Sequence, residues 1–123
     1  MSIQEKFDLT GKTAIVTGGS GLLGAEFSRT LAEAGANVIV ADIDSDAAEK
    51  TAQGLADSGF QAASFGLDVT RIESCRELVS LTLSKFGSLD ILVNSAALDP
   101  KFDADAVAAG ISPGKFEEYP LDQ

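Results

Sequence analysis

The sequence predicts an α/β protein with a doubly wound parallel sheet, and three observations favour that class. Short runs rich in Val and Ile alternate with longer amphipathic stretches in the order βαβαβαβ. A glycine-rich turn joins the first run to the first amphipathic stretch, and an aspartate ends the second run. Because such connections are right-handed, we expect the strand order 3-2-1-4, with a ligand crevice between strands 1 and 4.

The four candidate strands are short apolar runs without polar alternation, which is typical of strands buried on both faces of a parallel sheet. They span residues 13–17, 37–42, about 61–67 and 89–94. The third run contains Ala, Ser and Gly and is assigned mainly by its position. Strand 4 would be an open edge, which favours pairing with a further strand.

The helices between these strands are predicted from apolar residues at helical spacing and from a glycine after each helix. The expected inward faces are Leu23, Phe27, Leu31 and Ala34 before Gly35; Ala48, Ala52, Leu55 and Ala56 before Gly59; and Ile72, Cys75, Val79 and Phe86 before Gly87. Residues 70–73 have the pattern of a capping box at the start of the third helix. Cys75, on that helix, is expected to be structural.

Composition excludes several classes of function. The chain has 123 residues, the length of one domain, and its net charge of −10 disfavours nucleic acid or an anionic membrane surface as a partner. With no histidine and one cysteine, the sequence lacks a Ser-His-Asp or Cys-His catalytic set and an ordinary zinc site. No apolar run approaches the roughly 20 residues that span a bilayer, and the N-terminus is unlike a secretory signal. We therefore expect a cytoplasmic protein, which a single cysteine also suits.

Residues 19–24, GSGLLG, match G-x-G-x-x-G between a strand and a helix. The first glycine allows a tight turn, the second lets a pyrophosphate approach the backbone, and the third lets the helix pack against the strand. Asp42 ends the next strand about 20 residues later, where a carboxylate can accept both hydroxyls of an adenosine ribose. With no Lys or Arg beside it in the sequence, Asp42 favours NAD over NADP. The alternatives are a plain glycine turn and a solvated acid at a strand end.

Three segments resemble the short-chain dehydrogenase/reductase family: residues 7–19 (FDLTGKTAIVTGG), 67–70 (LDVT) and 89–97 (LDILVNSAA). The resemblance implies a Rossmann-type sheet, with a dinucleotide-binding half over residues 1–97 and a long loop with the start of the next helix over residues 98–123. It also implies a set of cofactor contacts. These are Gly18, Ser20, Gly21, Leu22 and Leu23 at the pyrophosphate and adjoining ribose; Asp42 at the adenosine ribose, with Ile43 beside the adenine; Asp68 and Val69 at the adenine; and Asn94, Ser95 and Ala96 near the nicotinamide ribose.

The sequence departs from the short members of this family at two places. The glycine spacing T-G-x-x-G-x-x-G is that of the extended members, which act on nucleotide sugars. Ser95 and Ala97 replace the second Asn and the Gly of the family's N-N-A-G pattern.

The residues that carry the family's chemistry are not expected in this chain. A catalytic tyrosine needs a lysine four residues later to lower its pKa, and four residues after the single tyrosine, Tyr119, comes Gln123. The resemblance therefore places the catalytic Ser, Tyr and Lys beyond residue 123, after a fifth strand. The implied partner is the C-terminal half of the same enzyme, present as missing sequence or as a second chain. Full-length chains of the family form dimers or tetramers.

Three functions remain open from the sequence. The leading interpretation is the NAD-binding portion of an oxidoreductase that acts on an alcohol or carbonyl substrate. The second is part of an NAD-dependent epimerase or dehydratase of nucleotide sugars, and the third is a non-catalytic NAD-binding regulatory module. Residues 98–120, which border the substrate cleft in the family, are a candidate for substrate specificity.

Overall fold

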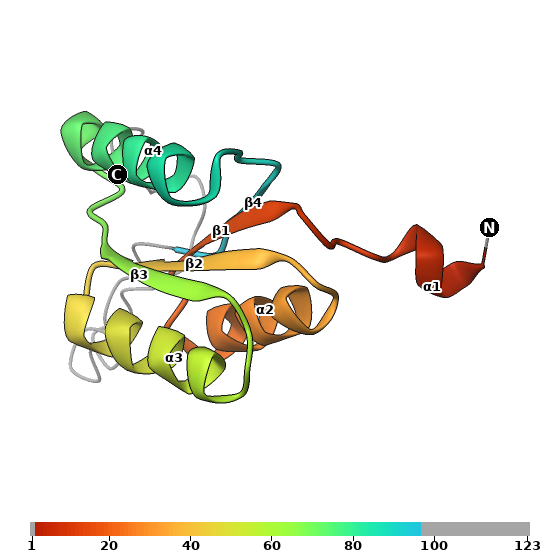
Figure 1. The fold of residues 1–123 in the computed structure, drawn as a ribbon. Helices are drawn as coiled ribbons and strands as arrows, with labels where there is room; N and C mark the ends of the chain where they lie inside the picture. Colours follow the sequence, from red (N-terminus) through yellow and green to blue (C-terminus); the bar gives the residue numbers. More distant parts are fainter. Residues whose placement is uncertain (1, 97–123) are drawn as a thin grey trace, which may run out of the picture.

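A computed structural model describes residues 2–96, which form a four-stranded parallel sheet in the order β3-β2-β1-β4 (Figure 1). Its strands are β1 (Thr13–Thr17), β2 (Asn37–Asp42), β3 (Ala62–Gly66) and β4 (Ile91–Asn94). The predicted fold class and strand order are confirmed. The expectations for residues 98–123, Tyr119 included, lie outside the described residues.

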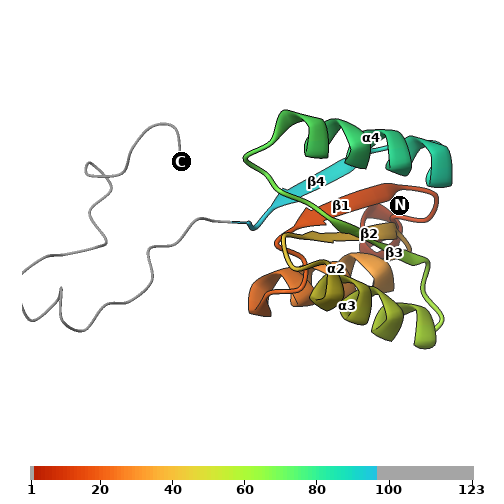
Figure 2. The ribbon, with the colours of Figure 1, turned by 90° about the vertical axis from the view of Figure 1, so that its left-hand side faces the viewer.

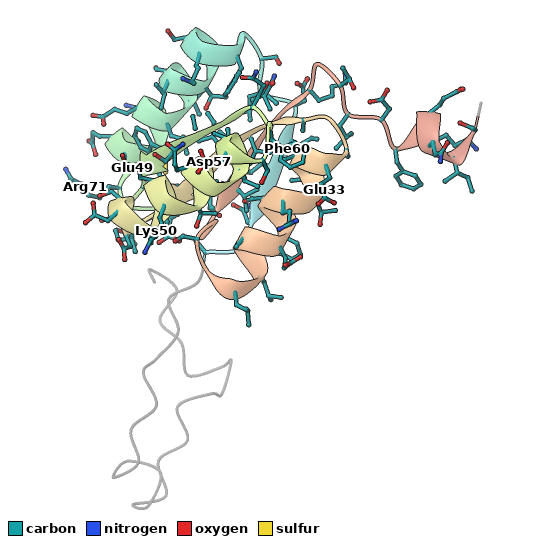
Figure 3. All side chains as sticks on the ribbon, turned by 60° about the horizontal axis from the view of Figure 1, so that its bottom comes forward. Glu33, Glu49, Lys50, Asp57, Phe60 and Arg71 are labelled. Carbon is teal, nitrogen blue, oxygen red and sulfur yellow. The ribbon has the colours of Figure 1, made fainter. Side chains whose placement is uncertain are left out.

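Helices lie on both faces of the sheet. After the short α1 (Ile3–Lys6), the chain forms α2 (Leu22–Glu33), α3 (Ser45–Asp57) and α4 (Ile72–Phe86). Helices α2 and α3 cover one face and α4 covers the other (Figures 1 and 2). The outer side of α3 is charged, and Glu49, Lys50 and Asp57 are exposed there (Figure 3). No helix within residues 2–96 has the length and apolar character to cross a membrane.

The core consists of two apolar clusters, one on each face of the sheet. Ala14, Val16, Val38 and Val40 pack with α2 and α3, and Ile15 and Ile39 belong to the cluster on the α4 side. Burying one such Val or Ile side chain contributes roughly 1.5–3 kcal/mol. Because neighbouring residues of β1 and β2 face opposite clusters, both strands need continuous apolar runs, and this explains the missing polar alternation.

The predicted inward face of α2 is wrong at Leu23 and Phe27, whereas Leu31 is partly buried and packs against the core. Leu23 is 66% exposed and Phe27 is 39% exposed, whereas the buried residues of this helix are Gly24, Ser28 and Ala32. The reason is close packing, since a Cβ atom on Gly24 would lie 2.0 Å from the carbonyl oxygen of Gly18. A helix this close to the sheet has small residues at its fully buried positions, and Leu23 and Phe27 lie outside.

In α3, Ala48, Ala52 and Leu55 are buried as predicted, but Ala56 is exposed. Gly35, Gly59 and Gly87, which follow the three long helices, all have positive φ as expected of helix-ending glycines.

The predicted inward face of α4 is confirmed in part, because Cys75 and Phe86 pack against the core cluster on this side of the sheet. Leu78 and Thr82 are buried, while Ile72 is 65% exposed and Val79 is 40% exposed. The expected capping box does not form, because the N-cap is Arg71, without a side-chain hydrogen bond. The Thr70 hydroxyl instead donates to Asp68 Oδ1 at 2.6 Å.

Candidate functional site

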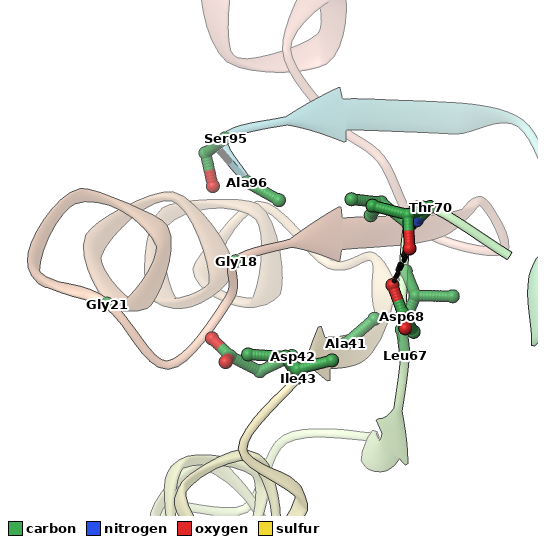
Figure 4. Close-up of a pocket in the computed structure, with 11 residues that line it drawn as sticks. Gly18, Gly21, Ala41, Asp42, Ile43, Leu67, Asp68, Thr70, Ser95 and Ala96 are labelled. Carbon is green, nitrogen blue, oxygen red and sulfur yellow. Dashed lines mark hydrogen bonds between the residues drawn. The ribbon is translucent and has the colours of Figure 1, made fainter. Parts of the chain in front are cut away.

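A cavity of about 300 Å³ opens at the carboxyl ends of the strands, where the strand order predicts a crevice (Figure 4). Its lining is formed by the residues at the ends of β1 and β2, the segment after β3 and the residues that follow β4. Its lining residues are Gly18, Gly21, Ala41, Asp42, Ile43, Leu67, Asp68, Val69, Thr70, Ser95 and Ala96.

The glycine turn between β1 and α2 forms one wall of this cavity. Gly18 has a φ of +63°, and a Cβ atom there would lie 2.9 Å from the Cα of Ala96, so both conformation and space require glycine. The Gly19 amide donates to the carbonyl of Ala41 at 3.0 Å, which joins the turn to the end of β2. Gly21 is the N-cap of α2 and has no side chain to cap the helix. The first amides of α2 are therefore suited to bind an anion.

The half-buried Asp42 carboxylate points toward this turn (Figure 4). Its Oδ2 accepts hydrogen bonds from the Ser20 hydroxyl at 2.6 Å and the Ser20 amide at 3.2 Å, and its Oδ1 accepts from the Asp44 amide at 3.1 Å. Burial alone would raise the pKa of Asp42. The hydrogen bonds from Ser20, Asp44 and Ile43 outweigh burial and hold that pKa below its ordinary value, so Asp42 is an anion at neutral pH.

A second carboxylate, Asp68, lies across the cavity. Its Oδ1 accepts from the Thr70 hydroxyl at 2.6 Å and from the Thr70 amide at 3.0 Å, and these two bonds lower its pKa. The Asp68 amide donates to Ser74 Oγ at 3.0 Å, which ties the loop to α4. Two exposed apolar side chains, Ile43 and Val69, add an apolar part to the same lining.

The wall after β4 is fixed to the end of β1 by hydrogen bonds. The Ser95 amide donates to the carbonyl of Thr17 at 3.2 Å, and the Ser95 hydroxyl donates to that same carbonyl. The Ala96 amide lies 3.4 Å from Thr17 Oγ1, which in turn donates to the Val93 carbonyl at 3.3 Å. Ser95, one of the departures from the N-N-A-G pattern, thus holds this wall against the glycine turn.

The structure brings most of the predicted site residues together. Eight of them line the cavity: Gly18, Gly21, Asp42, Ile43, Asp68, Val69, Ser95 and Ala96. Ser20 contacts Asp42 without lining the cavity, and Leu22, Leu23 and Asn94 are exposed outside it.

Three lining residues were not predicted: Ala41, Leu67 and Thr70. Ala41 and Leu67 could have been found from their place beside Asp42 and Asp68. The D-x-T spacing of Asp68 and Thr70 is a local hydrogen-bonding signal of the same kind.

The lining has the character of a site for a polar ligand that carries hydroxyl donors, a flat apolar part and an anionic group. Two carboxylates can accept hydrogen bonds, apolar side chains flank them, and α2 begins at the lining residue Gly21, where a helix favours an anion. Among the residues that the structure describes, neither Lys nor Arg lines this cavity. Within residues 2–96 no group of three His, Cys, Asp or Glu side chains could hold a metal ion.

Comparison with known proteins gives consistent matches. The sequence profile described as short chain dehydrogenase matches residues 12–119. A short chain dehydrogenase/reductase of Aspergillus oryzae, astE, is 43% identical over 106 residues, which are 85% of this chain and 40% of that protein. The 7alpha-hydroxysteroid dehydrogenase of Escherichia coli is 41% identical over 88 residues, 72% of this chain and 34% of that enzyme.

A solved structure shows the same arrangement of elements. It is a 7alpha-hydroxysteroid dehydrogenase in complex with NADH and 7-oxo glycochenodeoxycholic acid, and it superposes with a TM-score of 0.77 at 36% identity. The match covers 85% of this chain and 41% of the solved one. The chain therefore spans about 40% of the length of the relatives that it matches.

Proposed function

The chain belongs to the short-chain dehydrogenase family, and we propose that it is the NAD-binding part of an oxidoreductase acting on a small alcohol or carbonyl compound. The observation that supports this most is the cavity itself, where the Asp42 carboxylate and the amino end of α2 face the same space. A relative with the same fold holds NADH.

We assign the parts of NAD to the cavity by their chemistry. The amides of the glycine turn, from Gly18 to Leu23, would bind the pyrophosphate, as suits the amino end of a helix. Asp42 would receive the adenosine ribose, and Ile43 and Val69 would flank the adenine beside Asp68. Ser95 and Ala96, with Asn94 before them, would form the wall near the nicotinamide ribose.

Bound NAD would supply the hydride acceptor, and the residues described here would bind and orient it. Asp42 and Asp68 are the titratable side chains of the lining, and both have pKa values below the ordinary range, so neither suits proton exchange with an alcohol at neutral pH. We propose that the Ser, Tyr and Lys that carry proton transfer belong to the rest of the full-length protein. That part would also supply the strand beside β4, and full-length chains would assemble as dimers or tetramers.

The glycine spacing supports a second candidate function. Leu22 stands where the short members have glycine, and the resulting spacing resembles that of enzymes acting on nucleotide sugars. Such an enzyme would use NAD transiently and return it unchanged. Assaying the full-length protein for net NADH formation with alcohols, and for altered sugar nucleotides without it, separates the two functions.

The direct test of the proposal is calorimetric titration of the purified protein with NAD and with NADP. We expect NAD to bind and NADP to bind at least about tenfold more weakly, because a 2′-phosphate would meet the Asp42 carboxylate with no cation to offset it. Equal affinity for the two dinucleotides would refute the assignment of Asp42. Absence of binding by either would refute the proposed function as a whole.

A further inference from the structure

A groove of about 540 Å³ lies along the first turns of α4, and we call it the α4 groove. Arg76 supplies its positive charge, and its apolar lining consists of Val69, Ile72, Cys75 and Val79. Three of these apolar side chains, Val69, Ile72 and Val79, are exposed, and clustered exposed apolar groups mark interaction surfaces. Within residues 2–96, α4 is the only helix on its face of the sheet (Figures 1 and 2), so no described helix covers the groove.

Arg76 places a positive charge in the α4 groove of a strongly acidic protein, whose net charge is −10. Within residues 2–96 the single ion pair joins Arg29 to Glu33, so no carboxylate of this part of the chain pairs with Arg76. The acids closest to Arg76 in the sequence, Glu73 and Glu77, do not line the groove. The groove therefore suits an occupant that combines apolar side chains with carboxylates.

The chain itself contains a segment of this composition after the last residue that the structure describes. Residues 115–121 have the sequence KFEEYPL, in which two adjacent glutamates lie between two aromatic residues. The chain leaves the described structure at Ala96, which lines the cavity at the strand ends, and that cavity shares Val69 and Thr70 with the α4 groove. Phe116 follows Ala96 by 20 residues. A chain of that length can extend over roughly 65 Å, so the segment can reach the groove.

We propose that residues 115–121 of this chain dock in the α4 groove. Phe116 and Tyr119 cover its apolar floor, and the two glutamates between them face Arg76. Aromatic side chains provide a large apolar area, and the ion pair fixes the orientation of the segment more than its affinity. This docking needs no NAD, so it goes beyond the proposed function and can be tested separately from it.

The test uses Cys75, the single cysteine of the sequence, which is half-buried in the lining of the α4 groove. A docked segment shields its thiol from iodoacetamide, and the rate of alkylation is measured by mass spectrometry of the peptide that contains Cys75. We expect Phe116→Ser/Tyr119→Ser to speed this alkylation about tenfold, as for a contact that is formed about 90% of the time. Thermal melts of the same variant check that it folds.

The matched control is Phe102→Ser, which removes another aromatic side chain from the same part of the sequence. We expect this control to leave the alkylation rate of Cys75 unchanged. An unchanged rate in Phe116→Ser/Tyr119→Ser would overturn the inference. Shielding of Cys75 that increases with protein concentration would also overturn it, because a second copy of the chain would then cover the groove.

A second experiment tests the ion pair and leaves both aromatic residues in place. Glu117→Lys/Glu118→Lys should speed the alkylation of Cys75 in the unaltered chain and slow it in a chain that carries Arg76→Glu, because the two charges are then exchanged. A direct effect of the lysines on the thiol would have the same sign in both chains. Effects of equal sign would therefore overturn the assignment of Arg76. If Phe116→Ser/Tyr119→Ser does not fold, this reversal of sign decides the inference by itself.

Discussion

Asp42 and Asp90 lie at opposite ends of the sheet, and each accepts hydrogen bonds from a serine hydroxyl and from the backbone. Asp42 bonds to the amide and hydroxyl of Ser20, within the turn beside it. Asp90, just before β4, accepts from the Thr13 amide at 2.9 Å and from the Ser88 hydroxyl at 2.9 Å. The same chemistry thus prepares a binding site at one end and joins β4 to β1 at the other.

The difference between the two ends lies in what surrounds each carboxylate. Asp42 lines the cavity, whereas Asp90 lies outside that lining. The partner of Asp90, Thr13, is fully buried and also accepts a hydrogen bond from Asn37 Nδ2 at 3.3 Å. Asp90 therefore belongs to a network that joins three strands, and we expect its loss to affect stability rather than binding.

The largest effect is expected from Gly24→Val, which would disturb the binding end through the backbone. The new Cβ would lie 2.0 Å from the Gly18 carbonyl oxygen, so α2 must move away from the turn. We expect a loss on the order of 3 kcal/mol in the free energy of unfolding, together with loss of NAD binding. Chemical denaturation measures the free energy of unfolding, and calorimetric titration measures the binding of NAD.

The control for this change is Gly54→Ala, in the interior of α3, where no atom lies within 4 Å of the added Cβ. This substitution should stabilise the protein by about 0.5–1 kcal/mol. If Gly24→Val were as stable as the unaltered protein, the close approach of α2 to the glycine turn would be wrong.

Asp42→Asn should change binding strongly and stability little. Loss of the charge weakens the hydrogen bonds to the ribose, so NAD affinity should fall by about tenfold or more. The affinity for NADP should fall less than that for NAD, because the substitution also removes the repulsion between Asp42 and the 2′-phosphate. Asp57→Asn makes the same change of charge at the far end of α3 and should leave both affinities unchanged. An equal loss for NAD and NADP would contradict the role of the charge.

Asp90→Asn should lower the stability of the protein and leave its affinity for NAD almost unchanged. With its charge-assisted bonds to Thr13 and Ser88 weakened, we expect the Tm to fall by about 4–8 °C. NAD affinity, measured well below the Tm, should stay within about twofold of that of the unaltered protein. A loss of affinity larger than the loss of stability would show that the two ends of the sheet are coupled.

The smallest expected effect is on the pH dependence of stability. Hydrogen bonds from Thr13 and Ser88, with the charge of Lys12, hold the pKa of Asp90 below its ordinary value of about 3.9. A carboxyl with a lowered pKa contributes stability that is present above the ordinary value and lost as pH falls through the folded-state pKa. Thermal melts of Asp90→Asn below about pH 4 should therefore change less with pH than those of the unaltered protein. If the Tm of the two proteins changed equally with pH in this range, the contribution of the Asp90 carboxylate to stability would be contradicted.

The strands were predictable because burial on both faces leaves a direct mark on the sequence. The central positions of β1 and β2 are apolar on both faces of the sheet, and the predicted ranges match the observed ones. The face of α2 was not predictable by the same rule. Gly24, Ser28 and Ala32 are buried for their small size, so apolar periodicity pointed to Leu23 and Phe27 instead.

In the candidate site, too, some features could be predicted from the sequence and others could not. Asp42 could be found from its distance to the glycine turn, since a βαβ unit fixes where strand 2 ends. The contact from Ser20 to Asp42 depends on how the turn folds back toward β2, which residue spacing does not contain. Thr70 was interpreted as part of a capping box because that pattern is local, whereas its hydroxyl is bound by Asp68.

The pairing of β1 with β4 has a consequence for the order of events during synthesis. Thr17 and Asn94 are register partners, although α2, β2, α3, β3 and α4 all lie between β1 and β4 in the sequence. Domains begin to fold as they leave the ribosome, amino end first. The glycine turn, Asp42 and Asp68 emerge before Ser95 and Ala96 can close the remaining wall. A nascent chain that stops short of β4 thus contains the Asp42 side of the cavity without the Ser95 side, and the two sides meet only after β4 has paired with β1.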